Sequence, residues 1–453
     1  MERKSLTRRS ILRSAAIGSS TLAASTFAKP FVSGVFAAGR LEIGLWDHWV
    51  PGGNEAWKKL AQEFGDKNKV DVNLDFITSQ GDKLNLTIAA EAAAGAGHDI
   101  VRLADSQPGA YGKALEPLDE ITVALIQKFG KELEGSRYGG FHDGHWMAVP
   151  VSQGTIAIPC CGRIDLLKQH AGLDLQKMYP AGMPADKELA EHWTWDTFLK
   201  TADTMNKAGY PFGLPLSTWT DANNWVNSVF SSHGAFLVDE KGNTTVDSEA
   251  TRQVLEWFKK LVPHLPDSVF AWDNSQNNKH LISGQGSLIM NPPSAWAVAV
   301  RDRPDIGKKL WHLPAPKGPK GRYVGTNFGF LGVWEFSPNK SAAQDFIRYV
   351  TTEPAFKTIV DASRGYDIPP YANLRDFDIW KTEGPPVGVN YHYPPRGDVT
   401  SVMIGYPAPT QIANHLYAQG TICKLVARYA KQGYSMDRAI AQTAEEIEGY
   451  KRV

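Results

Sequence analysis

Cysteine is nearly absent from this sequence: its 453 residues include three, Cys160, Cys161 and Cys423. A disulfide framework needs an even and dispersed set of cysteines, so a disulfide-stabilised scaffold is excluded. One member of the adjacent pair, Cys160 or Cys161, could still bridge to Cys423 in an oxidising compartment. Because buried free thiols are the commoner state of isolated cysteines, both alternatives stay open at this point.

The sequence also lacks a net charge and, beyond its N-terminus, long hydrophobic runs. Lysine plus arginine and aspartate plus glutamate each number 48, so we expect neither a nucleic acid nor an acidic membrane surface as partner. No apolar run of about 18 residues follows the first 38, which predicts a soluble mature chain. With 453 residues the chain is too long for one ordinary hydrophobic core, and two lobes are expected.

Catalytic and cofactor motifs are missing as well. The sequence contains no Gly-x-Ser-x-Gly, His-Glu-x-x-His or Cys-x-x-Cys motif and no phosphate loop. His142 and His145 flank a predicted hairpin turn without a further ligand pair nearby, which favours surface histidines over a metal site. We therefore expect no cofactor, no resident metal and no catalytic residues.

What is present begins with an export signal. Arg8 and Arg9 form a twin-arginine motif, and a weakly apolar run rich in alanine, serine and glycine follows it. Residues 35–37 have the small-residue spacing of a cleavage site, so residues 1–37 are predicted to be a signal peptide that is cleaved near Ala37. This signal predicts passage of the folded chain through the twin-arginine translocase and residence in the periplasm.

Strand and helix patterns alternate after the signal. Residues 41–46, 70–77 and 99–104 read as strands, and helical periodicity lies between them, with Asn54 as the predicted cap of the first helix. This βαβαβ order predicts an α/β fold with a parallel sheet covered by helices on both faces. Ligands of such sheets lie beyond the carboxyl ends of the strands. The segments at those positions are residues 46–49, 78–80 and 105–107.

Further elements are predicted along the rest of the chain. Thr194 is the expected cap of a helix that carries Phe198 and Met205. The other predicted elements are helices over 223–234 and 341–351, strands over 287–290 and 328–334, and a surface excursion over 376–398.

Tryptophan is abundant, with 14 residues, and several stand beside polar residues in predicted loops. A core tryptophan normally has apolar neighbours, as Trp257 has. Indole rings next to hydrogen-bonding side chains suit a ligand with a flat apolar face and a polar rim. The tryptophans of this kind are Trp46, Trp49, Trp219, Trp225, Trp272 and Trp296.

A series of short sequence blocks runs through the chain: GHDIV at 97–101, GHWMAVP at 144–150, IDLL at 164–167, TWDTF at 194–198, ISGQGSLIM at 282–290 with SAW at 294–296, and SPNK at 337–340. In this order the blocks resemble the bacterial extracellular solute-binding protein family 1, the sugar-type periplasmic receptors of ABC importers. The chain departs from the family pattern at Cys160-Cys161-Gly162 and at His98, where the family often has proline.

The resemblance implies a two-lobe periplasmic-binding-protein fold with hinge-crossing strands and a ligand cleft between the lobes. It places crossings near residues 150, 288 and 332. The N-terminal lobe would combine 38–150 with 288–331, and the C-terminal lobe 151–287 with 332–453. It also implies a monomeric receptor that closes on a small-molecule sugar ligand and delivers it to ABC importer transmembrane permease subunits.

The predicted ligand-binding residues combine aromatic rings for the apolar face of a sugar with polar side chains for its hydroxyl groups. Each has a structural alternative: an indole can pack in the core, Asp or Ser can cap a helix, and an arginine can form a surface salt bridge. The predicted residues are Trp46, Asp47, His48, Trp49, Asp105, Ser106, Trp219, Asn223, Trp225, Ser294, Trp296, Asn327 and Arg364.

Other functions stay open. A receptor for another polar solute, such as a polyol, fits the same pattern, whereas a polyanion is disfavoured because the candidate loops plainly supply one cation, Arg364. An exported enzyme such as a glycoside hydrolase would need two carboxylates at a matched distance, and Asp47 and Asp105 are candidates. The missing motifs favour a binding protein over an enzyme.

Overall fold

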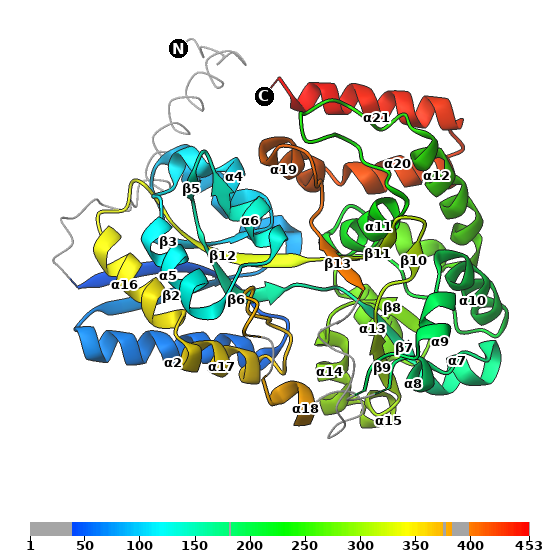
Figure 1. Ribbon diagram of the computed structural model, residues 1–453, viewed down its shortest axis with the longest axis horizontal. Coiled ribbons are helices and arrows are strands. Elements are labelled where there is room, and N and C mark those ends of the chain that lie inside the picture. Colours follow the sequence, from blue (N-terminus) through cyan, green and yellow to red (C-terminus); the bar gives the residue numbers. More distant parts are fainter. Residues whose placement is uncertain (1–38, 181–182, 375–376, 383–397, 453) are drawn as a thin grey trace, which may run out of the picture.

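The computed structural model describes residues 39–180, 183–374, 377–382 and 398–452 (Figure 1). The predicted signal peptide lies outside the described residues, and so does most of the predicted surface excursion over 376–398. Within the described part of the chain, every helix falls short of the length and apolar character that crossing a membrane requires.

A five-stranded sheet in the order β2-β1-β3-β12-β6 forms the centre of the first lobe. β1 (Arg40–Trp46) pairs in parallel with β2 (Asp71–Ile77) and β3 (Ile100–Ala104). β12 (Asn327–Val333) lies between β3 and β6 (Val149–Thr155) and is antiparallel to both. The predicted βαβαβ order and the parallel pairing of its strands are confirmed.

Helices cover both faces of this sheet because its strands alternate apolar side chains between two cores. Leu41 and Ile43 face a core with Trp57 and Phe346, whereas Trp46 packs in a second core that continues into the other lobe. The helices of the first core are α2 (Pro51–Asn68), α5 (Asp119–Phe129), α16 (Lys340–Val350) and α17 (Glu353–Ala362). Those on the opposite face are α3 (Lys83–Ala94), α4 (Gln107–Ala110) and α6 (Glu134–Gly140).

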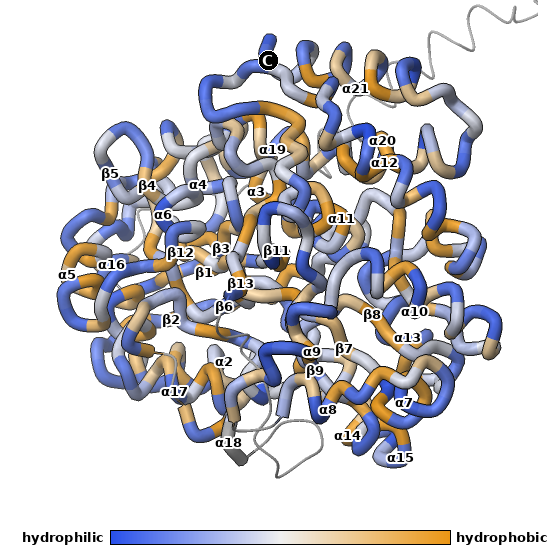
Figure 2. Tube along the Cα trace, turned by 45° about the vertical axis from the view of Figure 1, so that its right-hand side comes forward, coloured by the Kyte–Doolittle hydropathy of each residue, from blue (hydrophilic) through white to orange (hydrophobic). Residues whose placement is uncertain are grey.

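The second lobe has an antiparallel sheet in the order β8-β7-β9, formed by β7 (Cys160–Arg163), β8 (Leu288–Met290) and β9 (Leu310–Leu313). Its helices are α7 (Ile164–Ala171), α8 (Leu175–Met178), α9 (Lys187–His192), α10 (Trp195–Lys207), α11 (Thr220–His233), α12 (Glu249–Leu261), α13 (Gln276–Ile282), α14 (Ser294–Asp302) and α15 (Pro304–Gly307). Hydrophobic positions run through the middle of each lobe, and hydrophilic ones lie in the outer loops (Figure 2).

The remaining elements are short strands and the C-terminal helices. Of the helices after α17, α20 (Thr421–Ala430) packs on the second lobe, where it contacts α11 and α12, and α19 (Thr410–Ala418) reaches α4 of the first lobe (Figure 1). The other two are α21 (Met436–Tyr450), which contacts α20, and α18 (Ile379–Thr382), whose Trp380 donates a hydrogen bond to the Gly365 carbonyl oxygen just after α17. The short strands are β4 (Phe141–His142), β5 (His145–Trp146), β10 (Lys317–Gly318), β11 (Gly321–Gly325) and β13 (Val399–Val402).

The predicted division between the lobes is wrong in two places. β8 and β9 pair with β7 of the second lobe, so no crossing lies near residue 288 and most of 288–331 does not belong to the first lobe. α16 and α17 pack on α2 of the first lobe, although they fall within the predicted C-terminal part 332–453. The pairing of β8 with β7 joins segments more than 120 residues apart in sequence, which local patterns cannot report.

Two predictions about local structure have opposite outcomes. Thr194 caps α10, and its side chain accepts a hydrogen bond from the backbone N–H of Thr197 at 3.2 Å, as predicted. Asn54 does not cap α2, because the helix begins three residues earlier at Pro51. Proline suits that first helical position, since its fixed φ is helical and its missing N–H would have no partner there.

All three cysteines are buried and free, so the bridge to Cys423 that the sequence left open is not formed. Cys160 and Cys161 lie in β7, in the middle of the second sheet. Cys423 lies in α20, where its Sγ contacts Asn223 Oδ1 at 3.7 Å. Burial raises the pKa of each thiol, which keeps these groups protonated and unreactive.

The two strands that lead from one lobe to the other, β6 and β12, approach each other very closely. A Cβ atom at Gly154 would overlap the carbonyl oxygen of Asn327, and one at Gly329 would overlap that of Gln153. The register shifts at this point, between Asn327 and Gly329, as in a β-bulge. Glycine is required here because of this backbone approach.

We expect Gly329→Ala to lower the free energy of unfolding by about 2–4 kcal/mol, since the added methyl group meets a backbone atom that cannot rotate away. Urea titration monitored by circular dichroism measures the change. Gly449→Ala is the control: it lies in α21 with no atom within 4 Å of the new Cβ, and alanine should be neutral or stabilise by up to about 1 kcal/mol. Equal stability of the two variants would contradict the proposed constraint.

Candidate functional site

A cavity lies between the two lobes, where the sheet of the first lobe faces α11, α13 and α14 of the second. About 720 Å³ of unfilled space lies between its walls, a figure that includes its opening to solvent. Its lining residues are Trp46, Trp49, Ser79, Asp82, Leu84, Asn85, Arg102, Ala104, Ile158, Trp219, Thr220, Asp221, Asn274, Asn278, Asn291, Ser294, Asn327, Tyr366 and Tyr417.

The tryptophans of the cavity lining differ in how deeply they are buried. Trp46, at the end of β1, is 3% exposed, and the ring centroids of His48 and Tyr366 lie 4.6 Å and 5.9 Å from its own. Trp49 and Trp219 are partly exposed. The indole rings of Trp49 and Trp219 are therefore the ones with free area for a ligand, whereas Trp46 forms a fixed part of the wall.

Neutral amides and hydroxyls dominate the polar part of the second lobe. The Asn291 amide donates to Asn278 Oδ1 at 2.6 Å and to Ser294 Oγ at 2.8 Å. In the same lobe, Asn274 Oδ1 accepts the backbone N–H of Asp221 at the start of α11. These interactions hold amide groups at the cavity surface, where they can both donate to and accept from a hydroxyl-rich ligand.

The cavity carboxyl groups lie in an environment that disfavours their ionised form. Burial raises the pKa of Asp221 to about 7, although Asn277 Nδ2 donates to its carboxylate at 2.9 Å. Burial also raises the pKa of Asp82, which accepts from Asn85 Nδ2 at 2.7 Å. The pKa of Tyr417 rises to about 12 for the same reason, and its hydroxyl bonds Thr220 Oγ1 at 2.7 Å. The Asp221 carboxyl and the Tyr417 hydroxyl can thus act as hydrogen-bond donors near neutral pH.

Arg102 is the cation of the cavity wall. It stands in β3, is 3% exposed, and donates through Nε and Nη2 to the Gln153 carbonyl oxygen at 3.3 Å and 3.0 Å. Nη2 also donates to Asn327 Oδ1 at 3.1 Å. Since Gln153 is in β6 and Asn327 in β12, Arg102 ties β3 to both linking strands of the same sheet.

Several predicted site residues line the cavity, and they come from both lobes and from a linking strand. They are Trp46, Trp49, Trp219, Ser294 and Asn327. Contact with a ligand remains a prediction for each of them.

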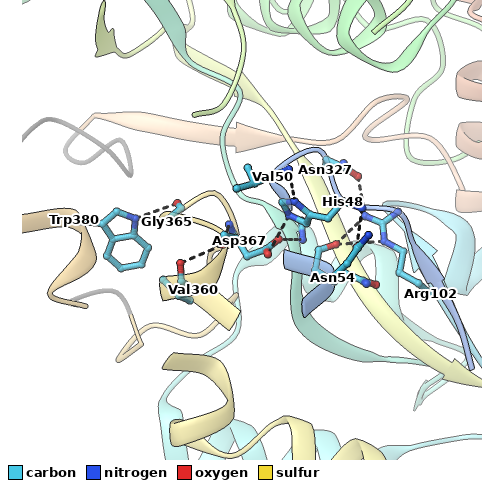
Figure 3. A network of polar contacts seen from close by, with 12 residues as sticks. His48, Val50, Asn54, Arg102, Asn327, Val360, Gly365, Asp367 and Trp380 are labelled. Atoms are coloured by element: carbon cyan, nitrogen blue, oxygen red, sulfur yellow. Dashed lines mark hydrogen bonds and ion pairs between the residues drawn. The ribbon is translucent and has the colours of Figure 1, made fainter. Parts of the chain in front are cut away.

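Asp47 and His48 follow Trp46 but do not line the cavity. Asp47 accepts a hydrogen bond from Asn54 Nδ2 at 2.7 Å on the surface. The His48 ring is buried: Nδ1 accepts the Val50 N–H at 2.8 Å, and Nε2 faces Asp367 Oδ2 at 3.1 Å (Figure 3). His48 does not reach the cavity, but its ring contacts the ring of Trp46, which does. His48 therefore helps to hold Trp46 in place.

Three other predicted residues, Trp225, Trp296 and Asn223, lie outside the cavity and are buried in the second lobe. Trp225 and Trp296 are fully buried, and Trp225 Nε1 donates to the Pro215 carbonyl oxygen. Asn223 is buried and donates to the Thr218 and Trp219 carbonyl oxygens. Arg364 is exposed and lies outside the cavity.

Asp105 and Ser106 are buried after β3, likewise outside the cavity wall. Asp105 Oδ1 accepts the Phe328 N–H at 2.9 Å and so fixes the start of β12. These residues position the strand ends from which Arg102 and Asn327 reach the cavity.

Sequence reasoning missed much of the polar wall. Thr220 and Asp221 follow the predicted Trp219 directly, and Asn291 stands three residues before Ser294, so a wider window would have included them. Arg102 carried a signal of its own, a charge inside an otherwise apolar strand. Tyr417 has no such signal, because only the tertiary fold brings α19 to the cavity. No cluster of three or more metal-ligating residues occurs among the residues that the structure describes.

Comparison with known families shows which family the chain belongs to. The sequence matches the family described as "Bacterial extracellular solute-binding protein" over residues 51–355, which is 305 of the 453 residues. The chain belongs to this family. A solute-binding protein of this family holds its solute between two lobes, and the cavity described above lies at that place.

Solved structures similar to this solute-binding protein agree on the fold. T. maritima MalE3 with bound maltose has a TM-score of 0.70 at 20% identity and covers 91% of this chain and 100% of its own. An ABC transporter solute-binding protein from Thermotoga lettingae with bound alpha-D-tagatose has a TM-score of 0.68 at 16% identity, with 91% and 100% covered. The GacH receptor of Streptomyces glaucescens, solved unliganded and with acarbose, has a TM-score of 0.67 at 19% identity, with 91% and 98% covered.

The solute-binding protein should become less stable as pH rises because of Asp105. Burial raises its folded-state pKa from 3.8 to about 7, so between these values the folded state binds the proton and the unfolded state does not. The contribution of Asp105 to stability is therefore largest below about pH 4 and is lost as pH rises to 7. Asp105→Asn keeps the acceptor for Phe328, and asparagine tolerates the positive φ of 46° at this position.

Relative to the wild type, we expect the stability of Asp105→Asn to rise by on the order of 2–4 kcal/mol between pH 4 and pH 7.5, given ~1.4 kcal/mol per pKa unit. Urea titrations at four pH values measure this difference. Asp66→Asn, at an exposed aspartate near the end of α2, is the matched control. A difference between Asp105→Asn and the wild type that does not change with pH would show that Asp105 is ionised throughout.

Proposed function

We propose that this protein is an extracytoplasmic receptor that captures a carbohydrate in the interlobe cavity and delivers it to the permease of an ABC importer. The carrying observation is the cavity itself, which combines the partly exposed indole rings of Trp49 and Trp219 with a wall of asparagine and hydroxyl side chains. A sugar presents apolar C–H faces and a rim of hydroxyl groups, and this lining complements both.

The proposal draws further support from the structural relatives. MalE3 was solved with maltose, and the Thermotoga lettingae protein with tagatose. A sugar transporter from Arthrobacter chlorophenolicus, with a TM-score of 0.67 at 14% identity and with 91% of this chain and 99% of its own covered, was solved with laminaribiose. At these identities the ligand does not transfer by itself, so the argument rests on the lining residues of this chain.

Delivery follows from the way the two lobes are joined. β6 and β12 connect them at the cavity floor, so a rotation about these strands opens or closes the cavity. Closure on the sugar would bring Trp219 and the α13–α14 amides toward Arg102 and Asn327. The permease would then recognise the closed form, in which both lobes present one surface.

The proposal also covers the cellular compartment and the oligomeric state of the protein. The twin-arginine motif at Arg8 and Arg9 supports export of the folded protein through the translocase, with cleavage near Ala37 and release into the periplasm. A monomer suits a receptor that must open, close and dock to a permease. In this reading the protein binds its sugar without chemical change.

A thermal-shift screen of the purified protein tests the function. The panel contains maltose, laminaribiose, D-tagatose, D-glucose, D-galactose, sugar acids and the polyols glycerol and mannitol. A ligand at 100 times its dissociation constant adds about 2.7 kcal/mol of stability, so a true ligand raises the melting temperature clearly. Product analysis after prolonged incubation must show the sugar unchanged, since turnover would favour an exported hydrolase.

Trp219→Ala should weaken binding of the identified sugar at least about tenfold, because a stacking surface is lost. Trp272→Ala is the matched control, since Trp272 is also a partly exposed tryptophan of the second lobe but lies outside the cavity and bonds Ser268 Oγ at 2.9 Å. Isothermal titration calorimetry gives the two dissociation constants. Equal loss in both variants, or in neither, would contradict stacking on Trp219.

A further inference from the structure

Arg102 differs from the other buried arginines in what neutralises it. Among the described residues, Arg163 pairs with Asp165 at 2.8 Å, Arg322 with Asp398 at 3.3 Å and Arg428 with Glu446. Arg102 is as buried as these, at 3% exposure, yet no carboxylate of the described chain lies within 4 Å of its guanidinium. It is also the one of the four that lines the cavity.

The carboxylates around Arg102 are held by other partners. Asp105 accepts the Phe328 N–H, and Asp367 accepts the Gly154 N–H and faces His48 (Figure 3). The cavity aspartates Asp82 and Asp221 are bonded to neighbouring asparagine side chains. Each is fixed by its own contacts, so none is free to turn toward Arg102.

Part of the guanidinium remains available. Of its five N–H donors, the three used point from Nε and Nη2 to Gln153 and Asn327, which leaves both N–H groups of Nη1 without a partner in the described part of the chain. The group is planar and stays charged. The Trp46 ring lies beside it, 5.6 Å from the guanidinium carbon to the ring centroid, and limits its rotation.

We infer that the ligand is an acidic saccharide, whose single anionic group binds to the Nη1 side of Arg102. Asp105 and Asp367 act on Arg102 only from a distance, without an ion-pair contact. A buried cation that contacts no carboxylate is unfavourable, and a ligand anion in the same cavity lowers that cost while completing the donor set. A ligand with one negative charge is proposed because Arg102 is the one arginine or lysine among the described residues that line the cavity.

This inference rests on the proposed function and narrows it. The indole rings and amides would bind the ring and hydroxyl groups of the saccharide, and Arg102 would select its charge. A carboxylate on a uronic acid and a sulfate ester on a sugar offer the same oxygen-rich monoanion, so both are tested as sources of the charge.

The test compares charged ligands with neutral counterparts of the same ring. Isothermal titration calorimetry with the purified protein uses D-galacturonate and D-glucuronate, their methyl esters, D-glucose 6-sulfate, and D-galactose and D-glucose. We expect at least one monoanionic sugar to bind about tenfold or more tightly than its neutral counterpart. The tightest-binding ligand would show whether the site prefers a carboxylate or a sulfate ester.

Arg102→Met should abolish this preference, bringing the ratio of neutral to charged dissociation constants close to one, while Arg102→Lys should keep part of it. Arg163→Met is the matched control: it removes a buried arginine that pairs with Asp165 away from the cavity, and should leave the ratio unchanged. If Arg102→Met does not fold, the same ratio of dissociation constants is compared between the wild type and Arg102→Lys. A ratio that is equal in the two proteins would then contradict the role of Arg102.

The outcomes separate the two proposals. Neutral sugars that bind as tightly as their acids, or a charge preference that survives in Arg102→Met, would overturn the acidic-ligand inference and leave the receptor function standing. Absence of binding by every sugar here and in the broader screen would contradict the proposed function itself, and the inference with it.

Discussion

The backbones of β6 and β12 meet at Gly154 and Gly329 with no room for a side chain between them. This contact brings the carbonyl oxygen of Gln153 and the side chain of Asn327 to one point at the cavity floor, where Arg102 from β3 bonds both. The same strands carry the chain between the lobes. The floor of the cavity and the hinge are therefore one structure, and a ligand that contacts Arg102 or Asn327 acts directly on the segment about which the lobes would turn.

The first lobe presents its half of the cavity as a fixed surface. His48 is held between Val50 and Asp367, and its ring lies against both Trp46 and Tyr366. Asp367 in turn bonds the backbone of Gly154, so this aromatic wall is anchored to the hinge strand. The second lobe offers a partly exposed indole, Trp219, and chains of side-chain amides, while Trp49 of the first lobe is partly exposed as well. Adaptation to a particular sugar would thus fall on Trp49 and on the second lobe, because Trp46 is already packed.

Local pattern predicted much of the fold, since the βαβαβ unit, the Thr194 cap and the strands of 287–290 and 328–334 all follow from nearby residues. The lobe division failed because β8 and β9 pair with β7 across long sequence distances. Trp46 and Trp49 line the cavity, as their position in a strand-end loop predicted. Trp225 and Trp296 were also predicted to bind the ligand because of their polar neighbours in sequence, but both are core residues. Arg102 was missed because a residue inside a strand, rather than beyond its end, reaches the cavity.

Buried charged groups have different partners inside and outside the cavity. Outside it, buried arginines such as Arg322 form an ion pair with a carboxylate of the same chain. Within the cavity, burial raises the pKa values of Asp82 and Asp221, and Arg102 bonds only uncharged oxygens. Removal of water by lobe closure would strengthen the interactions of Asp82, Asp221 and Arg102 with a ligand. The free energy of closure then depends on how well the polar groups of the ligand match a few side chains, and selectivity follows because a mismatched group would be left buried and unpaired.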